Sequence, residues 1–322
     1  MPILSSSDYK SPWFLPGRHL QTIIPSVLRK APRVTQEKER LELADGDFID
    51  LEWCRQGNGS RLVIFCHGLE ANAGASYVQE MADAFSQQNW DILAWSYRGC
   101  SGEMNRLPRS YYSSATKDLA ELVEHALRNH PAQQIDLVGF SLGGNLILKY
   151  LGEQSNQVSS RLGGAVTFSV PCDLSCSSRS CETAFNRIIY MPRFIRSFSE
   201  KVHQKHRLFP EEWHLDGLKK MRTFREFDNR YTAPIHGFND AEDYWKRSSS
   251  RPFLKKIKIP ALLVSAANDP FLGSQCYPRA EASASDFFHL EIPRKGGHVG
   301  FSTSQKGERW MAKRALRFLT KD

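Results

Sequence analysis

The sequence predicts an α/β fold, in which a mostly parallel sheet is covered by helices on both faces. Short apolar runs at residues 62–66 and 261–265 lack the polar–apolar alternation of a half-exposed strand. Amphipathic segments long enough to be helices separate such runs. Apolar residues make up 41% of the 322-residue chain, which is enough for one large core. We therefore expect a single domain over residues 1–322.

The predicted elements run from an N-terminal arm to a closing helix. Four prolines in residues 1–35 predict an irregular arm rather than a long helix, packed on the body by its apolar side chains. A hairpin is expected at residues 40–43 and 48–54, because Asp45-Gly46 between them is a strong turn signal. The expected buried strands are residues 62–66, 92–95, 135–138, 165–170, 261–265 and 287–292. The expected helices are residues 77–88, 116–129, 145–151 and 308–319.

The alternation breaks at residues 172–251, which show helical pieces and loops but no convincing strand. We expect a helical insert here, after the sixth strand, serving as a lid. Between residues 187 and 225, ten basic residues stand against four acidic ones, and apolar residues within 185–198 are spaced as a stripe. A lid that receives an acyl chain or touches anionic lipid fits this pattern. An ordinary insert packed on the body fits it equally well.

The composition argues against several other classes of protein. We expect neither a signal peptide nor a membrane-spanning segment. Seven cysteines without a framework spacing indicate free thiols in a reducing compartment, so a cytoplasmic location is expected. Cys172, Cys176 and Cys181 form no CxxC pair and have no nearby histidine, so no metal site is expected. The net charge of +8 comes without a recognisable nucleic-acid-binding module, and no nucleic-acid partner is predicted.

The pattern Gly139-x-Ser141-x-Gly143 lies between a predicted strand and a predicted helix. Such a sharp turn forces the serine into strained backbone angles, and the two glycines leave room for the bend. The strain holds the hydroxyl at the positive end of the following helix. A bland Gly-rich turn could contain the same three residues, so the strand–turn–helix context is what predicts a nucleophile at Ser141.

A serine nucleophile needs a base to take its proton and a third group to orient that base. His298 is the candidate base, because it lies in a Gly-rich loop at the carboxyl end of the last strand. Asp269 directly follows a strand end in an Asn-Asp-Pro sequence, and Asp173 follows the preceding strand. Both acids give the chain order Ser, Asp, His. We favour Asp269, although an aspartate before proline is also a common turn residue.

Acyl transfer also needs hydrogen-bond donors where negative charge develops, each worth ~3–4 kcal/mol. The expected donors are the backbone N–H groups of Leu142, next after the serine, and of Leu69, in the loop after an early strand. Arg98 follows a buried strand and should lie near the mouth of the site, either bracing two loops in an ion pair or contacting substrate. The sequence does not identify the residues that hold the rest of the substrate.

Several stretches together resemble the α/β-hydrolase superfamily. They are GFSLGGN at 139–145, HGLE at 67–70, YRGCSG at 97–102 and NDP at 268–270. Three more resemble one branch, the YheT-like esterases and hydrolases (AB hydrolase family 4): HLQT at 19–22, the run from Phe227-Asp228 to Gly237-Phe238, and DYW at 243–245. The likeness runs nearly from end to end. Where this family usually has two acids before the proline, the chain has Asn268-Asp269, which leaves Asp269 as the one carboxylate there.

The resemblance implies an α/β-hydrolase fold and acyl chemistry without naming a substrate. We predict a serine hydrolase that cleaves small carboxylic esters of short- to medium-chain acyl groups through an acyl-enzyme on Ser141. Neither a metal nor an organic cofactor is expected. An acyltransferase, with an alcohol replacing water, is one alternative. A non-catalytic binding protein on the same fold is another, although it would have no use for Ser141, Asp269 and His298 together. No oligomeric state is predicted.

Overall fold

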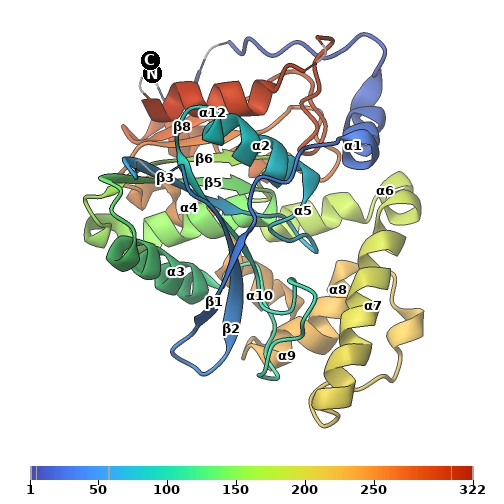
Figure 1. Ribbon diagram of the computed structural model, residues 1–322. Helices are drawn as coiled ribbons and strands as arrows, with labels where there is room; N and C mark the ends of the chain where they lie inside the picture. The colour runs from blue at the N-terminus through green and yellow to red at the C-terminus, as the bar shows by residue number, and fades with distance from the viewer. Residues whose placement is uncertain (1, 5, 57–58, 306, 321–322) are drawn as a thin grey trace.

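A computed structural model of the chain describes residues 2–4, 6–56, 59–305 and 307–320, with an eight-stranded sheet at its centre (Figure 1). The strand order is β1-β2-β4-β3-β5-β6-β7-β8. Antiparallel pairing joins β2 to β1 and to β4, and the other neighbours are parallel. The strands are β1 (Glu37–Glu42), β2 (Phe48–Cys54), β3 (Arg61–Cys66), β4 (Asp91–Ser96), β5 (Gln134–Phe140), β6 (Leu162–Phe168), β7 (Ala261–Val264) and β8 (Phe288–Glu291). The predicted mostly parallel sheet is confirmed.

Helices cover both faces of this sheet (Figure 1). α2 (Ser76–Ser86) and α12 (Trp310–Thr320) lie on one face, and α3 (Thr116–Asn129) and α4 (Leu142–Gln154) lie on the other. Each face has its own buried apolar cluster. The inner strands β4 and β7 are buried at every position because both faces of the sheet are covered there, whereas the edge strand β1 is polar and has no buried position. A short helix, α11 (Arg279–Ser283), precedes β8.

The N-terminal arm differs from the prediction, because residues Gly17–Leu28 form a helix, α1. The prolines misled the prediction for two reasons. Pro16 stands at the N-cap, where no helical hydrogen bond is lost. Pro25 lies in the last turn of α1, where it removes a single helical hydrogen bond. Gln21, Thr22 and Pro25 are buried against the body, so tertiary packing compensates for the missing hydrogen bond.

The segment between β6 and β7 consists of helices and loops. The structure describes all of residues 172–251 and assigns no strand to them. The helices are α5 (Leu174–Cys181), α6 (Ala184–Ile189), α7 (Met191–Leu208), α8 (Phe224–Phe227), α9 (Ala233–Ile235) and α10 (Ala241–Ser248), with a π-helical turn at Asp228–Thr232. We call this segment, residues 172–251, the insert. It contains a small apolar core of its own, whose members include Phe198, Val202, Trp213 and Tyr231. No helix in the described part of the chain is long and apolar enough to cross a membrane.

Candidate active site

Ser141 occupies a tight turn between β5 and α4. Its φ of 52° and ψ of −118° are strained for a residue with a side chain. The flanking glycines are required by close packing. A Cβ on Gly143 would lie 2.2 Å from the carbonyl oxygen of Cys66, and one on Gly139 would lie 2.7 Å from Cδ1 of Ile147. The turn therefore has the strand–turn–helix geometry that the sequence predicts.

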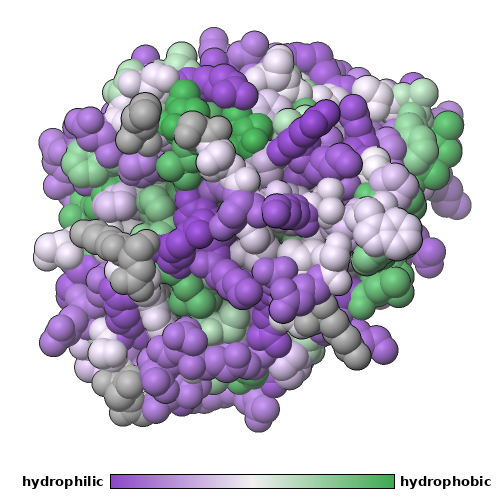
Figure 2. All heavy atoms as spheres, turned by 90° about the horizontal axis from the view of Figure 1, so that it is seen from above, coloured by the Kyte–Doolittle hydropathy of each residue, from purple (hydrophilic) through white to green (hydrophobic). Residues whose placement is uncertain are grey.

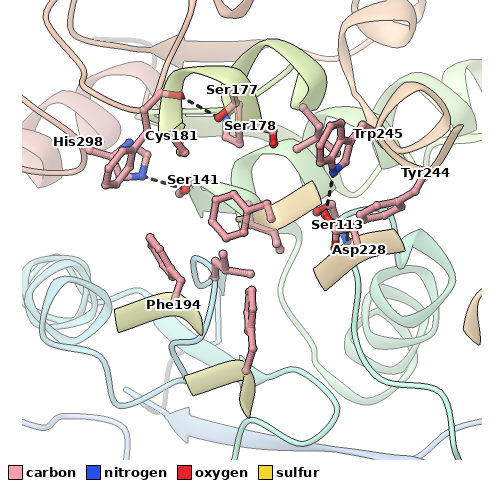
Figure 3. Close-up of a pocket in the computed structure, with 17 residues that line it drawn as sticks. Ser113, Ser141, Ser177, Ser178, Cys181, Phe194, Asp228, Tyr244, Trp245 and His298 are labelled. Carbon is pink, nitrogen blue, oxygen red and sulfur yellow. Dashed lines mark hydrogen bonds between the residues drawn. The ribbon is translucent and has the colours of Figure 1, made fainter. Parts of the chain in front are cut away.

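The structure brings Ser141, His298 and Asp269 into one hydrogen-bonded chain. The Oγ of Ser141 lies 2.9 Å from Nε2 of His298 (Figure 3), and Nδ1 of His298 lies 2.8 Å from Oδ2 of Asp269. Asp269 is 2% exposed, and its Oδ1 also accepts from the N–H of Phe271 at 2.9 Å. Because a carboxylate only accepts, the imidazole carries its proton on Nδ1. Nε2 is then free to accept the serine proton.

Asp173, the rival acid, serves a different purpose. Its carboxylate accepts a hydrogen bond from the N–H of Cys176 at 2.8 Å and so caps the N-terminus of α5. The alternative that the sequence leaves open between two aspartates is thus decided by distance. Asp269, and not Asp173, contacts His298.

Leu69 and Leu142 line a cavity that Ser141 also lines, and each carries a backbone N–H group. Neither donates a hydrogen bond to another group in the described part of the chain. The loop that carries Leu69 is fixed by Tyr77, whose hydroxyl accepts from the N–H of Gly68 at 2.8 Å. Glu70, the next residue, has a φ of 56°. Both residues predicted as oxyanion donors therefore hold an unused N–H next to the serine.

His67 supports the loop that carries Leu69. Burial lowers the pKa of its imidazole to about 3, so the ring is neutral. Its Nε2 accepts from the N–H of Tyr97 at 3.2 Å, which leaves the proton on Nδ1 to donate to the carbonyl oxygen of Gly68 at 2.7 Å. The role of His67 is structural, as its position at the end of β3 suggests.

The loop of His298 is braced by α1, a feature that reasoning from the sequence missed. Thr22 Oγ1 accepts from the backbone N–H of His298 at 3.0 Å. Gln21 Oε1 accepts from the side chain of Asn268 at 2.9 Å and from the N–H of Gly296 at 3.0 Å. These contacts tie the histidine loop and the aspartate loop to one helix. The only signal in the sequence was the HLQT stretch, whose meaning is visible only in three dimensions.

Glu70 connects the predicted oxyanion loop to the insert. Its carboxylate accepts from Lys201 Nζ at 2.9 Å and from the hydroxyl of Ser197, both on α7. It also accepts from the hydroxyl of Tyr111 on the body. The position of α7 and the backbone next to Leu69 are therefore mechanically linked.

Arg98 is buried at 2% exposure and serves as an ion-pair centre. It donates to both carboxylate oxygens of Asp118, at 2.7 and 2.8 Å, and it pairs with Asp47 and Asp45 at 2.9 Å. Of the two roles considered for it, bracing loops is the one that these contacts satisfy.

Two spaces adjoin Ser141. One is a cavity of about 120 Å³ between the body and the insert, with His298 and Ser141 at one end and Asp228, Tyr244 and Trp245 at the other (Figure 3). Its walls are mostly apolar side chains, among them Leu142, Phe194, Phe198, Phe224 and Phe271.

Asp228 brings a carboxyl group into these walls, besides the hydroxyl groups of Ser113, Ser177 and Ser178. Burial raises the pKa of its carboxyl to about 6, while the indole of Trp245 donates to it at 2.8 Å. The second space is a wider groove of about 590 Å³, which runs from Ser141 and His298 out between α1 and the start of α7.

The cysteines of the described chain are free thiols. Within the same residues, no group of three or more His, Cys, Asp or Glu side chains is arranged to hold a metal ion.

The chain is similar in sequence to proteins that are named as esterases or lipases. The family model of the alpha/beta hydrolase fold matches residues 61–170. "Putative esterase YheT" of Escherichia coli (strain K12) is 34% identical over 320 residues, which cover 95% of this chain and 93% of that protein. "Phospholipase ABHD3" of Homo sapiens is 27% identical, with 93% of this chain and 75% of that protein covered. "Monoacylglycerol lipase" of Saccharomyces cerevisiae is 29% identical, with 80% and 58% covered.

Solved structures of other proteins have the same fold as this chain. The esterase PF2001 of Pyrococcus furiosus superposes with a TM-score of 0.59 at 16% identity, over 91% of this chain and 96% of that one. At that identity the likeness bears on the fold alone. The identity to YheT extends over almost the whole of both chains and is therefore stronger evidence. It shows that the chain belongs to the α/β-hydrolase superfamily, in the family of YheT.

Proposed function

We propose that the protein is a serine hydrolase that cleaves carboxylic esters through an acyl-enzyme on Ser141. One observation carries the proposal: the hydrogen-bonded chain from Asp269 through His298 to Ser141 stands beside two unused backbone N–H groups. A serine and a base in contact, with the base oriented by a buried acid, is the arrangement that activates a hydroxyl. Relatives named esterase, phospholipase and monoacylglycerol lipase support ester chemistry.

The first half-reaction forms the acyl-enzyme. Nε2 of His298 takes the proton of Ser141 as Oγ attacks the ester carbonyl carbon, and the carbonyl oxygen becomes an oxyanion. The N–H groups of Leu69 and Leu142 stabilise that charge, each by ~3–4 kcal/mol. Asp269 stabilises the imidazolium. His298 then gives its proton to the departing alkoxide, the C–O bond breaks, and the alcohol leaves.

The second half-reaction repeats these steps with water. His298 takes a proton from the water, and the hydroxide attacks the acyl carbon. The tetrahedral intermediate then collapses, its bond to Ser141 breaks, and the serine recovers its proton from His298. An alcohol that replaced the water would turn hydrolysis into acyl transfer at the same centre.

The two spaces beside Ser141 suggest which parts of the substrate go where. The apolar cavity between the body and the insert suits the acyl chain, because each buried CH₂ adds ~0.8 kcal/mol of binding. Its 120 Å³ compares with the roughly 150 Å³ of a cavity that binds benzene, so it holds about five carbon atoms, at the short end of the predicted short- to medium-chain range. The wider groove suits the alcohol part. In this assignment the insert acts as the lid of the acyl cavity.

A series of p-nitrophenyl esters of increasing chain length tests this proposal. We expect kcat/KM to rise with each CH₂ and then to fall once the chain outgrows the cavity. For esters whose acyl-enzyme forms faster than it is hydrolysed, stopped-flow traces should show a burst of p-nitrophenol approaching one equivalent. Ser141→Ala should abolish the burst. If turnover persists in Ser141→Ala, the proposal is wrong. A second series with added short alcohols would reveal acyl transfer by the appearance of new esters.

A further inference from the structure

The exposed apolar side chains of this protein are concentrated on two segments. Ten large apolar residues are exposed in the described chain, and eight of them lie on residues 13–28 or 185–189. Trp13 is 86% exposed, Ile188 71%, Val27 67% and Leu28 64%. Isolated apolar residues on a surface are common, but a group of this kind marks a surface that is covered in use. We call the two segments, taken as residues 13–30 and 185–193, the docking face.

The two segments of the docking face lie side by side although they are far apart in sequence. The ring of His19 on α1 stacks on Phe185 of α6, with centroids 3.8 Å apart. Nδ1 of His19 also lies 3.2 Å from the hydroxyl of Tyr190. Figure 1 places α1 and α6 together on the right of the molecule, and in Figure 2 hydrophobic surface gathers at that right-hand edge among polar side chains.

Along the two stretches of chain that carry the docking face, every charged side chain is basic, although Arg29 and Arg33 pair with Glu80 and Glu52 from other elements. Residues 9–36 and 183–199 contain eight lysines and arginines and no aspartate or glutamate. Of the acids that flank them, Asp8, Glu37 and Glu200 pair with arginines, and only Glu182 is left without an ion pair in the described chain. Arg18 and Lys30 are exposed and form no ion pair with any described residue. Exposed apolar groups beside unpaired cations such as Arg18 and Lys30 suit an anionic lipid surface.

The docking face surrounds the mouth of the wider groove. Val27 of α1, Ile189 of α6 and Arg193 of α7 line that groove, which leads to Ser141. An ester held in a bilayer could therefore pass from the lipid into the site without crossing water.

We propose that the docking face binds an anionic lipid bilayer, with α1 and α6 lying in the interface. That it delivers an ester to Ser141 rests on the proposed function, but the binding itself does not. A second copy of the chain is a poorer occupant, because a symmetric contact would press two cationic faces together.

Vesicle binding without turnover tests the proposal. Full-length protein carrying Ser141→Ala is floated with vesicles of phosphatidylcholine alone or with added phosphatidylserine. We expect binding only with phosphatidylserine, and weaker binding as salt is raised. In that background, Arg18→Gln with Lys30→Gln should weaken binding about fivefold per charge removed. Leu28→Gln with Ile188→Gln should weaken it by roughly tenfold or more.

Matched controls lie on other faces. Lys219→Gln with Lys220→Gln removes two exposed charges from the insert, and Leu208→Gln removes an exposed leucine. The controls should bind as the parent does. Equal weakening by controls and docking-face variants, or no binding to either kind of vesicle, would overturn the proposal. Sedimentation that shows self-association lost in Leu28→Gln with Ile188→Gln, without vesicle binding, would overturn it in favour of a second copy.

Activity separates this proposal from the one on function. With Ser141 intact, the docking-face variants should hydrolyse a dissolved short ester at the parental rate and a vesicle-embedded ester more slowly. Vesicle binding by a protein that hydrolyses no ester would leave docking standing and remove the proposed function. Normal hydrolysis of both esters by every docking-face variant would leave the proposed function standing and remove docking.

Discussion

At the scale of residues, position at strand ends made Ser141, His298 and Asp269 predictable. Loops that follow parallel strands meet at one edge of the sheet, so a serine, an acid and a histidine in three such loops were expected to converge. The choice between Asp173 and Asp269 was not decided by this argument, because both follow strand ends. Only the measured contacts separate them: Asp269 meets His298, and Asp173 caps α5.

The two aspartates should therefore respond differently to the same substitution. Asp269→Asn should lower kcat by about 10⁴-fold, because the imidazole loses its orienting acceptor. Asp173→Asn is the matched control and should keep near-normal kcat. Thermal unfolding should show little loss of stability, because asparagine caps a helix about as well as aspartate does. A larger fall in kcat for Asp173→Asn than for Asp269→Asn would mean that the wrong acid has been assigned.

Thr22 is a positioning residue that the sequence alone did not reveal. Thr22→Val keeps the shape of the side chain but removes the oxygen that accepts from the His298 N–H. We expect kcat to fall by up to about 10²-fold with little change in KM, since small displacements of catalytic groups are costly. Thr22→Ser should restore most of the rate. A fall in melting temperature without a change in kcat would show that Thr22 only stabilises the fold.

At the scale of elements, the buried strands and the helices that cover them followed from apolar patterning, whereas α1 did not. Pro25 argues against a helix locally, and the burial of Gln21 and Thr22 against the histidine loop outweighs it. Such tertiary compensation leaves no periodic signal in the sequence. The unpredicted helix is also the one that holds the loops of Asp269 and His298 in place.

Arg98 holds the ends of several elements together. Arg98→Ala would leave the buried carboxylates of Asp47 and Asp118 without their counterion, and we expect a loss of ~3–5 kcal/mol in the free energy of unfolding. Arg106→Ala, which removes the partner of Glu42 in an exposed pair, should lower the free energy of unfolding far less than Arg98→Ala does. KM should stay near its parental value in both. A raised KM in Arg98→Ala without lost stability would indicate substrate contact instead.

Asp136 on β5 should make stability depend on pH. Burial raises the pKa of its carboxyl to about 7 in the folded protein, against 3.8 as the ordinary value. The folded state therefore holds the proton more tightly. The stabilisation from this group is complete below about pH 4 and is lost as the pH rises through about 7.

Asp136→Asn cannot titrate, so its stability relative to the parent should increase by at most ~4 kcal/mol between pH 4 and pH 8. Denaturant melts of both proteins across that range provide the measurement. A constant difference in the free energy of unfolding across the range would contradict this account.

At the scale of the whole molecule, the insert, α1 and the body share one site. Side chains of the insert line the apolar cavity beside Ser141, and Glu70 links α7 to the loop that carries Leu69. α1 fixes the histidine loop from the other side and forms the rim of the wider groove. The sequence predicted a helical insert but could not show which of its side chains face the cavity. Phe194 and Phe198 line it, while Ile188 faces outward.

The central claim is that Ser141 is the nucleophile, and covalent labelling tests it most directly. The protein is treated with a fluorophosphonate, and its mass and labelled peptide are determined. We predict one adduct, on Ser141, absent in Ser141→Ala and formed far more slowly in His298→Ala, which keeps the serine but lacks its base. An adduct on another residue, or equal labelling of Ser141→Ala and the parent, would contradict the account.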